Sequence, residues 1–116
     1  MTAKQVAAVL GFLGVVLGAS GTHGLEKTIA QVAKGPEWWH TATLYHLVHA
    51  AATLATGRED GRASAATWCF AVGVLLFSGS LYAMALTDAR WLGGATPFGG
   101  VAFLAGWALL LRRRTD

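Results

Sequence analysis

The second apolar segment of the chain carries three side chains that could perform chemistry. Residues 41–50 read TATLYHLVHA, so Tyr45, His46 and His49 fall within five positions of a mostly apolar run. On an α-helix, Tyr45 and His49 lie one turn apart on the same face, which we expect to point inward, and His46 is three residues from His49 and therefore also its neighbour. The set of candidate ligand-binding residues consists of Tyr45, His46, His49, His23, Ser80 and Tyr82.

This residue pattern allows several interpretations. Two histidines three residues apart can share a metal ion, with Tyr45 assisting. A haem can be held between histidines of two helices. A proton or quinone site could use Tyr45 as a donor and His49 as an acceptor. In the structural interpretation, neutral His49 and Tyr45 bond to each other or to a neighbouring helix and lock the helices together.

The surroundings of these residues favour the structural interpretation. No Asp or Glu lies in any apolar segment, and the single cysteine, Cys69, lies at a different depth from His49. A tight transition-metal site needs more ligands than this. A haem would need a symmetric dimer, because only this segment has a deep histidine. We therefore expect no metal and no cofactor.

The sequence contains no recognisable catalytic set. It shows no combination of nucleophile, base and acid, and no phosphate-binding loop after a strand. A catalytic centre would have to form in the loops, where His23, Glu26, His40 and Asp88 could gather. Because that cluster is unspecific, we expect the protein not to be an enzyme.

The composition indicates a membrane protein. The chain has 116 residues, enough for one domain, with a hydrophobic fraction of 54% and a charged fraction of only 13%. A soluble domain of this size needs more charge to cover its surface. Lipid around most of the surface explains the imbalance. A soluble helical bundle is disfavoured, because the third segment has no polar stripe on any side.

Four uncharged segments divide the chain. Each is long enough to cross the roughly 30 Å hydrocarbon core as a helix, in which all backbone polar groups are paired internally. The sequence therefore predicts an all-α, four-helix transmembrane bundle as a single domain over residues 1–116. The predicted spans are about 5–22, 38–56, 64–87 and 91–111. Although the N-terminus resembles a signal peptide, three more apolar segments follow, so we interpret the first as a retained helix.

The distribution of Lys and Arg predicts the orientation. With four spans both termini share one side, and that side carries six of the nine basic residues: Lys4, Arg58, Arg62, Arg112, Arg113 and Arg114. The positive-inside rule then places both termini in the cytoplasm of a bacterial inner membrane. Arginines directly after an apolar run are typical of a lipid anchor rather than of a nucleic-acid-binding face. We expect membrane lipid as a partner and no nucleic acid.

A short amphipathic segment separates the first two spans. Leu25, Ile29 and Val32 recur at helical spacing between polar residues, and Gly35-Pro36 follows. This pattern predicts an interfacial helix over about 24–34, lying on the outer membrane surface.

Small residues recur at spacings of three and four in the spans. Such positions let helix backbones approach closely in lipid, where no water-driven effect pulls helices together. Pro97 is expected to kink or unwind the fourth helix locally. The predicted helix-packing positions are Gly11, Gly14, Gly18, Gly21, Gly79, Ala83, Pro97, Gly99 and Gly106. They could join helices within one chain or between copies in a homo-oligomer.

Four stretches together resemble a known family. They read GASGTHGL (18–25), TATLYHLVHA (41–50), LFSGSLYAMALT (76–87) and LGGATPFGGVAFLAGW (92–107). The chain resembles the domain of unknown function 423 family of small membrane proteins, related to transmembrane protein 256. The sequence departs from the family pattern at His46, where a Gln-like residue is expected, and at Asp88, where glycine is more usual. The resemblance implies a four-helix integral membrane protein and supplies no reaction.

The resulting expectation is a small multi-pass inner-membrane protein with a non-enzymatic structural or accessory role. One alternative is a module binding a quinone, haem or ion, centred on Tyr45 and His49. Another is a small transport or channel subunit, with a polar path over Ser78, Ser80, Tyr82, Thr96 and Pro97. The sequence does not identify a small-molecule ligand.

Overall fold

The computed structural model describes residues 1–113 as an all-helical chain, which confirms the all-α part of the predicted fold class. Within these residues the only β-type pairing is an isolated bridge between Thr2 and Arg62. Arg114, one of the predicted cytoplasmic arginines, lies outside the described residues. The elements are α1 (Ala3–His23), α2 (Glu26–Ala30), α3 (Gly35–Thr53), η1 (Leu54–Thr56), α4 (Ala65–Gly73), η2 (Val74–Ser78), α5 (Gly79–Thr87), η3 (Arg90–Gly94) and α6 (Thr96–Arg112).

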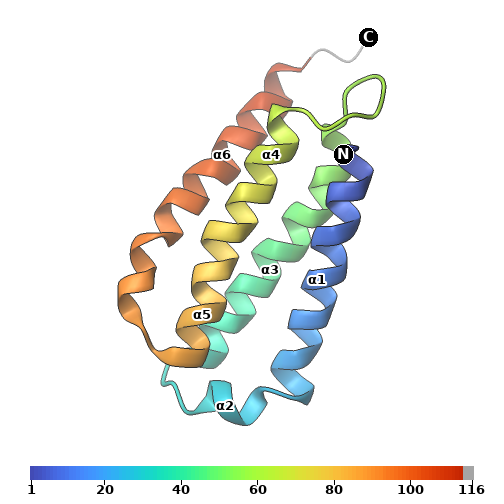
Figure 1. The fold of residues 1–116 in the computed structure, drawn as a ribbon. Helices are drawn as coiled ribbons and strands as arrows, with labels where there is room; N and C mark the ends of the chain where they lie inside the picture. Colours follow the sequence, from blue (N-terminus) through green and yellow to red (C-terminus); the bar gives the residue numbers. More distant parts are fainter. Residues whose placement is uncertain (114–116) are drawn as a thin grey trace.

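The long helical segments lie side by side, and α2 crosses one end of them (Figure 1). α4, η2 and α5 follow one another without a break and form a single rod. The molecule measures 51 Å along its longest axis, more than the roughly 30 Å of a hydrocarbon core. The amino terminus and the end of α6 lie at the opposite end from α2 (Figure 1).

Capping residues explain where two of the helices begin. The Thr2 hydroxyl accepts a hydrogen bond from the backbone N–H of Gln5, and the Gln5 side-chain oxygen accepts one from the backbone N–H of Thr2. Ser64 and Thr67 form the same reciprocal box at the start of α4. Each box satisfies backbone N–H groups that the first helical turn leaves unpaired. The sequence thus sets these boundaries locally.

Among the described residues, three helical segments are long and apolar enough to cross a membrane: Ala3–His23, Ala65–Thr87 and Arg90–Arg112. These correspond to the predicted first, third and fourth spans. α3, the predicted second span, is not among them, although it forms a helix of 19 residues. Its histidines, threonines and Glu37 make it less apolar than the other three.

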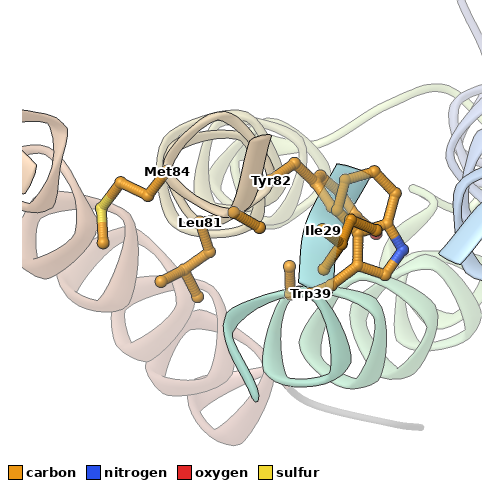
Figure 2. Close-up of a cluster of buried hydrophobic side chains, with 7 residues drawn as sticks. Ile29, Trp39, Leu81, Tyr82 and Met84 are labelled. Atoms are coloured by element: carbon orange, nitrogen blue, oxygen red, sulfur yellow. The ribbon is translucent and has the colours of Figure 1, made fainter. Parts of the chain in front are cut away.

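The connection between α1 and α3 differs from the prediction. Its helix, α2, has five residues rather than the roughly eleven expected, and turns follow it up to α3. Ile29 and Val32 are 2% and 8% exposed, so the apolar residues of this segment are directed into the protein rather than toward lipid. Ile29 joins a cluster that includes Trp39, Leu81, Tyr82 and Met84 (Figure 2). Packing against the other helices therefore stabilises this segment.

Glycines set the contact between α1 and α3. A Cβ atom at Gly14 would lie 2.6 Å from the Leu47 side chain, and one at Gly18 would lie 2.9 Å from Thr43. A Cβ atom at Gly21 would lie 2.5 Å from the Trp39 indole ring. Side chains of α3 therefore occupy the space that these three glycines leave open.

A second set of glycines lets α6 approach the α4–η2–α5 rod. A Cβ atom at Gly106 would collide with the ring of Phe70, and one at Gly99 with the backbone of Phe77. Gly73, which the sequence did not single out, receives the ring of Phe103 in the same way. The two helices thus interlock, each placing aromatic residues against glycines of the other.

Several predicted packing positions lie elsewhere. Gly11 and Gly79 have no atom of a neighbouring helix close to their Cβ positions, so of the two alternatives for these glycines, the structure does not support a contact between helices of one chain. Ala83 is half-buried in α5. Pro97 is exposed in the first turn of α6, where it needs no N–H partner, and the unwound stretch is the short 3-10 helix η3 before it.

Candidate functional site

α3 presents its three candidate residues to different environments. His46 and His49 are 2% and 5% exposed, whereas Tyr45 is 40% exposed. The expected sharing of one inward face by Tyr45 and His49 is therefore wrong for Tyr45. His46 and His49 face inward, and Tyr45 lies at the edge of the helix packing. The difference arises because α1 and α5 cover the side of α3 that bears His46. Nothing in the sequence indicated that this side of α3, rather than the side of Tyr45, would be covered.

His46 joins three helical rods. Its Nε2 lies 2.8 Å from the carbonyl oxygen of Leu10 in α1, and its Nδ1 lies 3.0 Å from the hydroxyl of Tyr82 in α5. Because a carbonyl can only accept, Nε2 carries the proton and Nδ1 accepts from Tyr82. The Tyr82 hydroxyl also lies 3.3 Å from the Thr43 hydroxyl. Both ring nitrogens of a neutral His46 are thus paired.

His49 joins α3 to α6 in a similar way. Its Nδ1 lies 2.7 Å from the backbone carbonyl of Tyr45, one turn earlier, and therefore donates to it. Its Nε2 accepts a hydrogen bond of 3.0 Å from the indole N–H of Trp107. The ring stacks on Phe103, with centroids 3.7 Å apart and an interplanar angle of 11°. His49 is therefore neutral in this arrangement, and each of its polar atoms has a partner.

Tyr45 makes aromatic contacts rather than the side-chain hydrogen bond to His49 that the sequence suggested. Its ring centroid is 4.5 Å from that of Phe77 and 6.2 Å from that of Phe103. Within the described residues its hydroxyl has no hydrogen-bond partner. Tyr45 and His49 line an open groove of about 460 Å³ between α3 and α6, together with residues such as Pro97 and Trp107.

The buried hydroxyl groups form further links between helices. Ser78 donates to the carbonyl of Ala42 at 2.7 Å, and the hydroxyls of Ser80 and Thr96 lie 2.5 Å apart. Ser78 ends the π-helical turn η2, a wider turn than that of an α-helix. Within residues 1–113 no buried side-chain nitrogen or oxygen lacks a partner. The polar path proposed for a transport subunit is therefore occupied by paired groups.

The remaining candidates do not join this network. His23 is exposed at the end of α1, about 20 Å along the helix from Leu10, the residue that His46 contacts. Of the four residues of the hypothetical loop cluster, Glu26 and His40 line one pocket, which His23 and Asp88 do not line. Within residues 1–113 no three His, Cys, Asp or Glu side chains are grouped so that they could hold a metal ion.

Sequence reasoning missed the partners of the two histidines. Leu10, Trp107 and Phe103 were not candidates, because nothing in a single sequence indicates which residues meet across 36 or 58 positions.

Asp88 has an unusual backbone conformation. It ends α5 in the left-handed conformation, with φ of 56°, which glycine adopts without strain. The expectation that glycine is more usual at this position thus has a conformational explanation.

Comparisons with known proteins match the chain to one family model and to several membrane proteins. A family model described as "Protein of unknown function (DUF423)" matches residues 17–100. The UPF0382 inner membrane protein YgdD of Escherichia coli (strain K12) is 43% identical over 111 residues, covering 90% of this chain and 82% of that protein. The UPF0382 membrane protein YwdK of Bacillus subtilis (strain 168) is 41% identical over 110 residues, covering 90% of this chain and 88% of that protein.

A third relative is also a UPF0382 membrane protein. The UPF0382 membrane protein SSP2132 of Staphylococcus saprophyticus is 39% identical over 115 residues, covering 92% of this chain and 94% of that protein. No solved structure is significantly similar to the chain. The resemblance seen in the sequence is therefore confirmed, and the chain belongs to the DUF423 family of small membrane proteins.

Proposed function

We propose that the protein is a non-enzymatic structural or accessory protein of the bacterial inner membrane, crossing it four times with both termini in the cytoplasm. The basic residues at the termini and in the loop after η1 support this orientation. The backbone of Ala3 donates to Gly61, and that of Ala63 donates to Met1, so this loop and the amino terminus lie together. Arg113 joins them through hydrogen bonds to Ala55 and Thr56.

The burial pattern of α3 supports a second span despite its modest hydropathy. Its large outward-facing side chains in the middle of the helix are Leu44, Tyr45, Leu47 and Val48. Its polar residues at that depth, His46 and His49, face the other helices. A helix of this kind can cross a membrane because its polar groups are paired inside the protein. The α2 end would then lie at the outer surface.

One observation carries the structural role: all four ring nitrogens of His46 and His49 have a hydrogen-bond partner. A nitrogen engaged in this way is not free to bind a metal ion or haem iron, or to exchange protons with a ligand, unless the bond breaks. Interhelical hydrogen bonds of this kind hold helices together in lipid. The histidines therefore act as links between helices.

The test is to purify the full chain in mild detergent and measure what it carries. The structural role predicts no Soret absorption, no stoichiometric metal by elemental analysis and no quinone in an organic extract. It also predicts that the His46→Leu and His49→Leu variants are less resistant to thermal unfolding. A stoichiometric cofactor that is lost in the His49→Leu variant while the helical content is retained would contradict the proposal.

A second candidate function is suggested by the groove beside Tyr45. Tyr45, an exposed residue, lines this groove together with Phe77 and Phe103. A flat lipophilic ring such as a quinone could stack there and bond to Tyr45 without disturbing His49. The same extraction tests this candidate, because a bound quinone should then be lost in Tyr45→Phe and retained in His49→Leu.

A further inference from the structure

A pocket of about 330 Å³ lies at the α2 end of the molecule, between the ends of α1 and α3. Its volume falls in the range of small-ligand sites, roughly 300–1,000 Å³. It shares no residue with the groove beside Tyr45, and it adjoins the hydrogen-bond network of His46 only through Thr43. Residues of α1, α2 and α3 all contribute to its walls.

The floor of this pocket is apolar and rigidly held. The Trp39 side chain lies between α1 and α3, and its indole N–H donates to the carbonyl of Leu17 at 2.8 Å. Trp39 and Ile29 are 5% and 2% exposed, and both belong to the buried cluster of Figure 2. Since no Cβ atom fits at Gly21, the indole ring packs directly on the backbone of α1.

The rim of the pocket is polar and offers mainly hydrogen-bond acceptors. Glu26 and His40 are exposed, and within the described residues their side chains have no hydrogen-bond partner. The Thr22 hydroxyl already donates its proton to Ala19, so it can only accept a further bond. The Thr43 hydroxyl lies deeper and contacts Tyr82.

The charge of the lining is opposite to that of the whole chain. Glu26 is the only Asp or Glu among the lining residues, and none of them is Lys or Arg. The chain as a whole carries a formal charge of +3. The pocket therefore combines one carboxylate without a basic neighbour in the lining, several acceptors and an apolar floor.

We propose that this pocket binds a primary ammonium group on a short aliphatic stem, as in the ethanolamine headgroup of an aminophospholipid. A primary ammonium has three N–H donors for Glu26, His40 and the threonine hydroxyls. A trimethylammonium group, as in choline, has no N–H donor. The stem would lie over Trp39. The inference rests on the proposed function in one respect: the proposed orientation in the membrane places the pocket at the level of the lipid headgroups, where such lipids present their amines.

Binding is measured on the full-length protein in detergent, independently of its orientation in a membrane. The probe is dihexanoyl phosphatidylethanolamine, titrated while mass spectrometry of the intact complexes counts bound lipid. We expect one saturable site and binding at least roughly tenfold weaker for dihexanoyl phosphatidylcholine. Free ethanolamine and phosphoethanolamine are added as competitors, and effective competition by either would assign the same ammonium site to a soluble amine.

Matched variants locate the site. Glu26→Gln removes the charge at nearly constant shape and should weaken binding roughly tenfold. Glu37→Gln is the control, because Glu37 is exposed in the first turn of α3 and does not line the pocket. His40→Phe, which keeps a ring, should weaken binding roughly threefold. Circular dichroism verifies that the helical content is unchanged.

Three results would overturn the proposal. The first is equal binding of the ethanolamine and choline lipids, with no competition by free amines. The second is unchanged affinity in both Glu26→Gln and His40→Phe. The third is an equal loss in Glu37→Gln, which would indicate general surface charge instead of a site. A stoichiometric cofactor found in the preceding test would refute the structural role without affecting this assignment.

Discussion

The indole N–H of Trp107 donates a hydrogen bond of 3.0 Å to Nε2 of His49, across 58 residues of sequence. The bond connects α6 to α3 and determines which nitrogen of His49 carries the proton, because the other nitrogen faces the carbonyl of Tyr45. A polar atom that loses its partner inside an apolar environment destabilises the fold. This pair therefore provides a direct test of the structural role.

Trp107→Phe should lower the free energy of unfolding by about 0.6–1.7 kcal/mol, which spans the average and the largest contribution of hydrogen bonds between membrane helices. The free energy is measured by reversible unfolding in mixed micelles with increasing SDS. In the His49→Phe, Trp107→Phe double variant the loss should be smaller than the sum of the two single losses, because both polar partners are gone. Strictly additive losses would show that the two side chains are not coupled.

His46 should tolerate replacement by glutamine better than by leucine. The Gln amide can donate to Leu10 and its oxygen can accept from Tyr82, whereas Leu leaves the Tyr82 hydroxyl without its nitrogen acceptor. We expect His46→Leu to lower the unfolding free energy by about 1 kcal/mol more than His46→Gln. Equal losses, measured by the same SDS titration, would mean that His46 contributes by packing alone.

The glycines should differ sharply in their tolerance of a methyl group. Gly99→Ala would drive a Cβ atom into the backbone of Phe77, which cannot move aside easily, so a loss of about 1–3 kcal/mol is expected. Gly11→Ala meets nothing within 4 Å and should be neutral, or stabilising by up to about 1 kcal/mol through helix propensity. If Gly11→Ala instead shifts the protein from an oligomer to a monomer in size-exclusion chromatography, Gly11 contacts a second copy.

Arg113 should stabilise η1, the turn that follows α3, more than the neighbouring Arg112 does. The Arg113 guanidinium donates to the carbonyls of Ala55 and Thr56 in η1, each at 3.1 Å, where the last carbonyl groups of a helix have no intrahelical partner. Arg113→Gln should cost about 1 kcal/mol, since hydrogen bonds from a charged donor are lost. Arg112, which is exposed, is the matched control, and Arg112→Gln should have little effect on the unfolding midpoint.

The orientation predicts which positions react with a membrane-impermeant maleimide in intact cells. In a Cys69→Ser background, the Gln31→Cys variant should be labelled directly, because Gln31 follows α2 on the proposed outer side. The Glu59→Cys variant should be labelled only after the cells are permeabilised. If both positions react alike, α3 does not cross the membrane, and the reverse pattern would invert the orientation.

The sequence by itself determined the all-helical class, the membrane setting and the approximate limits of the long helices. Charge-free segments of sufficient length leave few alternatives, because an unpaired backbone cannot enter lipid. It also placed His46 and His49 among the candidate polar residues, although it centred the site on Tyr45 and His49. Of the small positions that it identified, Gly14, Gly18, Gly21, Gly99 and Gly106 lie in helix contacts, as the two histidines do. These inferences rest only on the composition of each segment and on the 3.6-residue period of an α-helix.

Only the tertiary structure decided how each helix is rotated about its axis. The helical period relates Tyr45 to His49, but the positions of α1, α5 and α6 decide that His46 is buried and Tyr45 exposed. The wider turn of η2 interrupts the α-helical register of its rod and precedes Tyr82, which bonds to His46. Whether a glycine is filled by a neighbour, as Gly99 is and Gly11 is not, likewise depends on helix rotation. Such contacts arise from packing between distant segments, so a pattern within one segment cannot reveal them.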